Sequence, residues 1–229
     1  MKMPVRSFVY AVMLTASWTA FGAGGGSMPS PSPTIQGREP PSPEEQARSA
    51  YNAGVSSVEK GEELQADAAR QTDARKQQKL RDKARKAYES ALKKFARATD
   101  IRPGMYEAWN YTGYCLRKLG KYEEALAAYD RALSLKPNYA EAIEYRGHAC
   151  LGLNRLGEAK EAYLTLFRDN RKLAASLLTA MQEWVGEHRG DSGVDAGTFE
   201  AFASWVSERS TIASQTAGLG REGAASRWH

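Results

Sequence analysis

The feature that most restricts how this chain can fold is a self-similarity with a period of 34 residues. Residues 34 apart that match are Trp109–Gly113 with Ile143–Gly147, Ala125 with Ala159, Tyr129 with Tyr163, and, running backwards, Pro137, Ala132, Tyr129 and Ala125 with Pro103, Ala98, Phe95 and Ala91. A fixed period of this length is typical of helical repeat arrays, because each unit buries its apolar face only against its neighbours.

Residues 106–139 contain nearly the whole pattern of one known family. The matching residues are Trp109, Gly113, Leu116, Gly120, Tyr122, Ala125, Tyr129, Ala132 and Pro137. The chain therefore resembles the tetratricopeptide repeat (TPR) family. The resemblance implies pairs of antiparallel helices, with small residues where helices touch, aromatic residues between units and a proline that ends the second helix. The next unit, residues 140–173, has Arg171 in place of that proline, which allows its second helix to run on.

The first unit contains an insertion. Gly54 and Gly61 lie 59 residues before Gly113 and Gly120, and 59 is one period of 34 plus 25 extra residues. Lengthening only the second helix would leave its start about 37 Å from the end of the first, at 1.5 Å per residue. The insertion, residues 63–87, must therefore run outward and return. Apolar residues continue at helical spacing on both sides of a polar break, which predicts a helical hairpin, with a disordered basic loop as the alternative.

Composition agrees with an all-α fold. Valine and isoleucine total only 12 of 229 residues, too few for a large buried sheet. We expect a TPR helix–turn–helix solenoid of three units with an extended first hairpin and C-terminal capping helices. The expected segments are unit 1 at 44–103 with its insertion at 63–87, unit 2 at 106–139, unit 3 at 140–173, capping helices at 174–210 and a flexible tail at 211–229.

The N-terminal segment has the pattern of an export signal. Lys2 and Arg6 precede an apolar stretch over residues 7–21, and small residues follow it. The stretch is shorter than the roughly 20 residues that span a bilayer. We expect a signal peptide at 1–22 cleaved after Gly22, no transmembrane segment after cleavage, and a periplasmic or otherwise secreted protein. An uncleaved membrane anchor is the alternative.

Residues 23–43 predict a linker. Six of the nine prolines lie between residues 28 and 43, a composition that favours extended chain. The linker ends at Ser42, Pro43 and Glu45, which together form a helix-start pattern.

Few residues offer catalytic or metal chemistry. The three histidines are scattered, and Glu144 with His148, four apart on one helix, is more often an ion pair than a metal site. Cys115 and Cys150 lie on the first helices of adjacent units, one position out of register, which favours two buried free thiols over a disulfide. We expect no enzyme activity, no cofactor and no metal.

The insertion concentrates positive charge. It carries eight basic residues against four acidic ones: Arg70, Arg75, Lys76, Lys79, Arg81, Lys83, Arg85 and Lys86. A solvated helical face and an acidic partner, such as an anionic envelope surface or an acidic protein, are both open interpretations. Nucleic acid is not expected, because the chain has an export signal and no base-stacking aromatic residues alternate with the charges.

The family resemblance implies an exported adaptor or scaffold that binds a peptide or protein segment in the concave groove of the first helices. The family correspondence assigns to that groove Arg48, Tyr51, Asn110, Tyr114, Arg117, Glu144 and His148, with Lys118 at the rim. Asn110, Tyr114 and Arg117 follow one another at i, i+4 and i+7, which makes one polar–aromatic stripe.

The expected ligand is an internal segment. Tyr51 and Val55 occupy two positions that are polar in family members that grip a C-terminal carboxylate. The alternative function, from a different class, is binding of a polyanion or an envelope surface through the basic insertion. An enzyme accessory subunit is a third reading.

Overall fold

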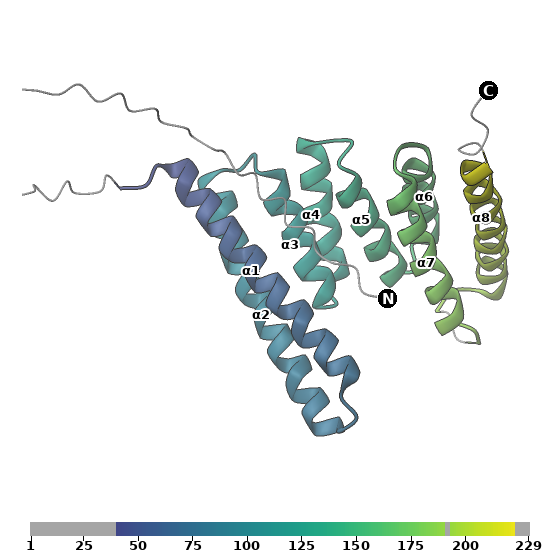
Figure 1. Cartoon of the computed structure of the whole chain (residues 1–229), viewed down its shortest axis with the longest axis horizontal. Helices are drawn as coiled ribbons and strands as arrows, with labels where there is room; N and C mark the ends of the chain where they lie inside the picture. The colour runs from purple at the N-terminus through teal and green to yellow at the C-terminus, as the bar shows by residue number, and fades with distance from the viewer. Residues whose placement is uncertain (1–39, 191–192, 223–229) are drawn as a thin grey trace, which may run out of the picture. The chain divides into compact units, whose positions relative to one another are not determined.

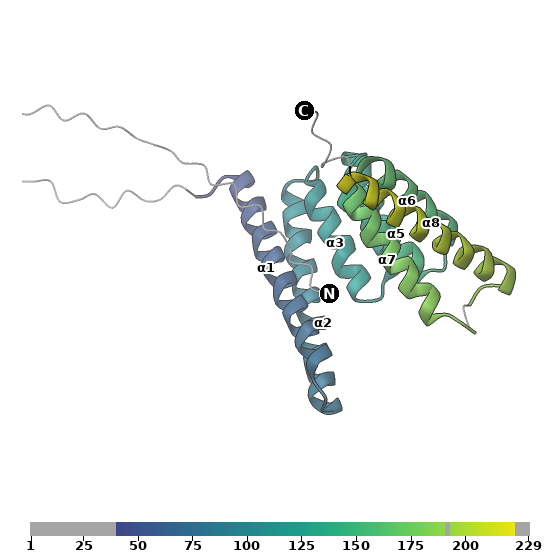
Figure 2. The ribbon, with the colours of Figure 1, turned by 45° about the vertical axis from the view of Figure 1, so that its right-hand side comes forward.

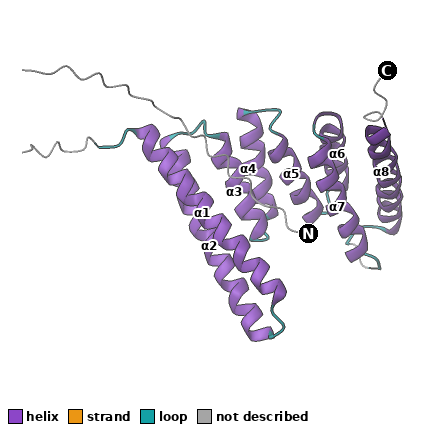
Figure 3. Cartoon of the chain, viewed as in Figure 1, coloured by secondary structure: helices purple, strands orange, loops and turns teal. Residues whose placement is uncertain are grey.

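The computed structural model describes residues 40–190 and 193–222, and every regular element in this part of the chain is a helix (Figures 1 and 3). The helices are α1 (Pro43–Arg70), α2 (Ala74–Ile101), α3 (Tyr106–Lys118), α4 (Tyr122–Leu135), α5 (Ala140–Gly152), α6 (Leu156–Asp169), α7 (Arg171–Glu187) and α8 (Ala196–Glu222). They belong to one contact unit that begins at Ser42. The predicted signal peptide at 1–22 and most of the linker at 23–43 lie outside the described residues.

The start of α1 follows the pattern that the sequence predicts. Ser42 Oγ accepts a hydrogen bond from the Glu45 backbone N–H at 3.2 Å, and the Ser42 N–H donates to Glu45 Oε2 at 2.8 Å. Pro43 occupies the first turn, where its missing N–H costs nothing. The bond from the Ser42 backbone also lowers the pKa of Glu45.

The insertion is a continuous helical hairpin. α1 and α2 have 28 residues each, whereas α3 and α4 have 13 and 14, and Figures 1 and 2 show the two long helices side by side. Gly120 ends the short unit with a φ of +77°, but its counterpart Gly61 lies inside α1. The reversal occurs instead at 71–73, where Asp73 accepts a hydrogen bond from the Lys76 N–H at 3.0 Å. The extended first hairpin is therefore confirmed.

Equivalent glycines pack against equivalent aromatic rings in the first two units. A Cβ added to Gly54 would lie 2.5 Å from Phe95 Cε1, and one added to Gly113 would lie 2.6 Å from Tyr129 Cε1. Both rings are fully buried. The insertion therefore leaves the packing register of its unit unchanged.

Each helix packs mainly against its neighbours in sequence, and the first helices α3, α5 and α7 also contact one another in order. The buried side chains form two clusters, one around α1, α2 and α3 and one that runs from α4 to α8. The capping helices continue this arrangement, since Trp205 of α8 packs edge-on against Tyr163 of α6 with ring centroids 5.4 Å apart.

Two sequence-based boundaries are wrong. The second helix of unit 3 does not run on: Asn170 ends α6, and its side chain accepts a hydrogen bond from the Leu173 N–H at 3.2 Å to start α7. The cap thus begins at Arg171 instead of 174. The expected tail at 211 is also too early, because α8 continues to Glu222. Alanine sustains a helix well, so the Ala/Gly/Ser composition did not require a loop there.

Candidate functional site

The polar–aromatic stripe lies along α3 and is more buried than the sequence suggests. Asn110 is only 2% exposed and Tyr114 only 7%. The Asn110 Oδ1 atom has no hydrogen-bond partner among the described residues. Buried polar atoms normally have one, because an unmade hydrogen bond costs about 1–3 kcal/mol.

Tyr114 is held by contacts from three helices. Its hydroxyl donates a hydrogen bond to the Glu62 carboxylate of α1. Its ring packs against Tyr111 of α3 and against Tyr145 of α5, with centroids 6.4 and 5.2 Å away. Burial and then the Glu62 charge raise the pKa of Tyr114 far above its usual value. Tyr114 therefore connects the hairpin to the repeats.

Arg117 extends the stripe between two tyrosine rings. Its guanidinium carbon lies 5.1 Å from the ring centre of Tyr114 and 5.6 Å from that of Tyr145, which is cation–π range. Its Nε atom is buried and has no hydrogen-bond partner within the described part of the chain.

On α5, Glu144 and His148 lie together below the surface. Glu144 is 5% exposed, and its Oε1 atom is 3.8 Å from His148 Nε2. Burial lowers the pKa of His148, and the charges of Arg117 and Lys118 act in the same direction, while Glu144 opposes them. At neutral pH the pair is therefore a carboxylate beside an uncharged imidazole, not the expected ion pair.

One pocket joins the stripe to the C-terminal half of the protein. It has a volume of about 300 Å³ and is lined from α3, α5 and α7 by Arg117, His148, Leu151, Gly152, Ala180, Glu183, Trp184, Glu187 and His188, and by Tyr122 of α4. We call it the α3–α5–α7 pocket. Its walls combine a cation, two carboxylates and a Trp184–His188 stack with ring centroids 4.4 Å apart.

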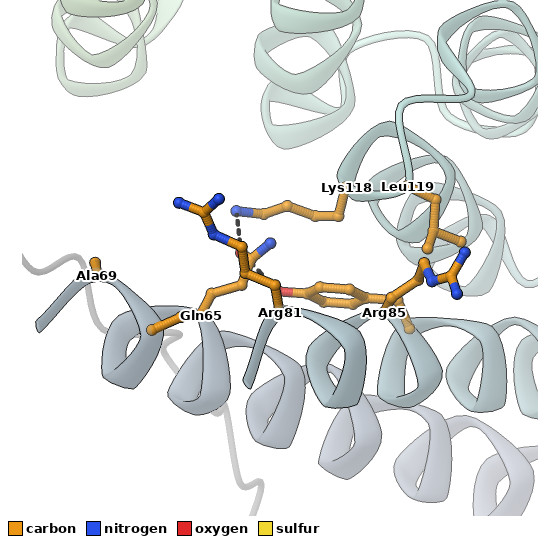
Figure 4. A pocket seen from close by; sticks show the side chains of 8 residues that line it. Gln65, Ala69, Arg81, Arg85, Lys118 and Leu119 are labelled. Carbon is orange, nitrogen blue, oxygen red and sulfur yellow. Dashed lines mark hydrogen bonds between the residues drawn. The ribbon is translucent and has the colours of Figure 1, made fainter. Parts of the chain in front are cut away.

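A second pocket lies between the hairpin and the end of α3 (Figure 4), and we call it the hairpin pocket. It has a volume of about 360 Å³ and is lined by Gln65, Ala68, Ala69, Arg81, Arg85, Tyr88, Lys118 and Leu119. Gln65 Oε1 accepts hydrogen bonds from the Tyr88 hydroxyl at 3.1 Å and from Lys118 Nζ at 3.3 Å. Burial, followed by the charge of Arg117, lowers the pKa of Lys118.

Residues 70–140 match a family model described as tetratricopeptide repeat. The chain carries tetratricopeptide repeats. The match begins at the turn of the hairpin and takes in α2, α3 and α4, so it covers less than a third of the 229 residues. No curated protein matches the chain.

Solved TPR structures resemble this chain in fold. The second TPR domain of the human RPAP3 protein, in complex with an HSP70 peptide, has a TM-score of 0.46 and 23% identity, over 60% of this chain and 96% of that chain. The first TPR of Spaghetti (RPAP3), bound to an HSP90 peptide, has a TM-score of 0.38 and 22% identity, over 55% of this chain and 94% of that chain.

The predicted groove residues of the TPR array divide into separate environments. Arg117 and His148 line the α3–α5–α7 pocket, whereas Lys118 lines the hairpin pocket. Tyr51 packs against Phe95 and Tyr111, with centroids 5.9 and 5.8 Å away, as part of the aromatic core. Arg48 lies exposed on α1.

All eight basic residues of the insertion are exposed, but they are not equivalent. Arg70 forms an ion pair with Asp67. Only Arg81 and Arg85, four apart on α2, line the hairpin pocket.

Sequence reasoning missed the acidic side of the α3–α5–α7 pocket. Glu183 and Glu187 belong to α7, which the sequence presents as a capping helix with an apolar stripe. Their spacing of four on the helix was the available signal, because it sets two carboxylates on one face.

Several sequence expectations concern absent features. Both cysteines are free and buried, as the sequence favours, and burial raises the pKa of Cys115 to about 12 and that of Cys150 to about 11. Residues 40–190 and 193–222 contain no cluster of three or more His, Cys, Asp or Glu that could hold a metal ion. Within those same residues, no helix is both long and apolar enough to cross a bilayer.

Proposed function

We propose that this protein is a non-catalytic adaptor that binds an internal segment of a protein partner along the first helices of its TPR units. The observation that carries this proposal is the α3–α5–α7 pocket, which presents Arg117 as a donor opposite the acceptors Glu183 and Glu187. A peptide backbone offers both N–H and C=O groups, so it needs a surface with both acceptors and donors.

The apolar part of the pocket suits a side chain of the same segment. Leu151, Ala180 and Trp184 line it beside the polar groups. Small apolar walls with a few oriented polar groups are typical of specific recognition sites. Aromatic and arginine residues also dominate the energetics of protein interfaces.

The charges favour an internal segment over a chain terminus. A terminal carboxylate entering the α3–α5–α7 pocket would meet Glu183 and Glu187, and like charges at short range repel. Tyr51 and Val55, both half-buried, leave the first unit without the polar residues of a carboxylate clamp.

We also propose that the adaptor acts outside the cytoplasm. The supporting observation is the basic, apolar and small-residue succession over residues 2–26, which has the pattern of a secretory signal.

Selection of peptides from a random phage-displayed library on the mature protein tests the adaptor function. We expect selected peptides to bind the wild type and to lose affinity about tenfold or more with Arg117→Gln, because that residue is the pocket's only permanent cation. Arg131→Gln is the matched control, since Arg131 is exposed on α4 and lines neither pocket.

Two results would contradict the proposal. One is a library that yields no binding peptide. The other is a set of peptides whose affinity falls equally in Arg117→Gln and Arg131→Gln, because that would indicate a general charge effect and not recognition in the pocket.

A further inference from the structure

The hairpin pocket has an unusual charge balance. Three of its eight lining residues are cations, Arg81, Arg85 and Lys118, and none is acidic. Within the described residues, none of the three forms an ion pair with a carboxylate. Most other surface arginines and lysines of an array with 27 acidic residues have such partners within reach only by chance, so proximity of three uncompensated cations in one recess is notable for its cost.

The cations are fixed in position by neutral groups. Gln65 accepts a hydrogen bond from Lys118 Nζ, and the Tyr114 ring centre lies 5.5 Å from the same nitrogen. Arg81 and Arg85 stand four apart on α2, on the helix face that looks toward Lys118 (Figure 4). The recess is therefore preorganised for an anion.

We propose that the hairpin pocket binds the carboxylate side chains of an acidic segment of a protein partner. Arg81 and Arg85 each offer a planar pair of N–H donors that matches a carboxylate, and Lys118 adds a third charge. The site does not depend on the α3–α5–α7 pocket, because the two pockets have no lining residue in common.

The shape of the pocket favours a carboxylate side chain over a flat anionic surface. Ala68, Ala69, Leu119 and Tyr88 line its interior between the cations. An aspartate or glutamate has a hydrocarbon stem that can cover such walls, with its charge at the tip. A membrane surface would instead engage the basic residues that point away from the pocket, such as Lys79 and Lys83.

Fluorescence anisotropy with a fluorescein-labelled hexaglutamate peptide tests this site in the full mature chain. We expect Arg81→Ala/Arg85→Ala to weaken binding about tenfold or more, and Lys118→Gln to weaken it severalfold. The control is Lys79→Ala/Lys83→Ala, which removes the same charge at the same spacing from the same helix but outside the pocket. All five side chains are exposed or half-buried, so melting curves should be nearly unchanged.

The outcomes separate the site from its alternatives. Equal losses in the two double variants would overturn the proposal in favour of unspecific attraction to the hairpin. Tight binding to phosphatidylglycerol vesicles but not to hexaglutamate would overturn it in favour of a membrane surface. Arg117→Gln should leave hexaglutamate binding intact, so failure of the adaptor proposal and failure of this one can be told apart.

Discussion

The hydroxyl of Tyr114 on α3 donates a hydrogen bond to the carboxylate of Glu62 on α1, across 52 residues of sequence. Gly61, next to Glu62, packs against Tyr88, so the bond lies where the hairpin leaves the repeat. The stripe residue that the sequence offers as a partner contact is therefore a structural link between the insertion and the array.

Removal of that hydroxyl should destabilise the protein. We expect Tyr114→Phe to lower the free energy of unfolding by about 1–2 kcal/mol, because Glu62 then loses a hydrogen bond in a partly buried site. Tyr106→Phe is the control: its hydroxyl meets only the exposed Lys136, so the change should stay within about 0.5 kcal/mol. Urea denaturation measures both. Equal effects of the two variants would contradict a structural role for Tyr114.

The glycine at position 61 should not tolerate a methyl group. A Cβ there would lie 2.7 Å from Tyr88 Cε1, so we expect Gly61→Ala to cost about 1–3 kcal/mol through overpacking. Gly157→Ala in α6 is the matched control, since its Cβ would meet nothing within 4 Å and alanine favours helix, with a gain of up to about 1 kcal/mol. Thermal melts of the two variants should shift in opposite directions.

Deletion of residues 63–87 should leave a folded array. The junction then reads Gly61, Glu62, Tyr88, the same spacing as Gly120, Lys121, Tyr122 in the second unit. We expect a cooperative melt followed by circular dichroism, together with loss of hexaglutamate binding because Arg81 and Arg85 are gone. A deleted chain with no cooperative transition would mean that the hairpin is part of the folding core.

Stability should fall as the pH drops below neutral, in part through His148. Its pKa in the folded protein is lower than the usual 6.5, so the unfolded chain takes up the proton more readily. The contribution of His148 is thus complete above pH 6.5 and is lost as the pH falls below that value. Urea denaturation at pH 7.5 and 5.5 should show a smaller loss for His148→Gln than for the wild type. An identical loss in both would remove His148 as a cause.

The N-terminus of the mature protein should lie at Ala23. The small residues Ala20 and Gly22 suit the positions before a signal-peptidase cut. N-terminal sequencing of the protein from fractionated cells checks this. A retained Met1 in a membrane fraction would show that the segment anchors the chain instead.

Sequence reasoning succeeded where the contacts follow the repeat. The 34-residue offset predicts that Gly54 and Gly113 play one role, and each lies against a ring of its own unit, Phe95 and Tyr129. The extra 25 residues predict an outgoing and a returning helix because antiparallel neighbours leave no other geometry.

It failed where a contact joins residues with no periodic relation. The Glu62 carboxylate on Tyr114 and the carboxylates of Glu183 and Glu187 near Arg117 arise from neighbouring helices, and no offset of 34 connects them. Asn170 ended α6 in place of a proline because one side chain can serve as the cap of the next helix, which a family pattern does not encode.

Arg117 and Lys118 are consecutive residues, yet they line different pockets. A single partner could therefore be held bivalently, with its acidic residues at Lys118 and its neighbouring backbone at Arg117. Once one contact forms, the second becomes intramolecular, with an effective concentration in the millimolar range for a short flexible connection. Two individually weak sites would then give tight binding only to partners in which both features lie at the right separation, so the insertion would act as a device for selecting partners by spacing.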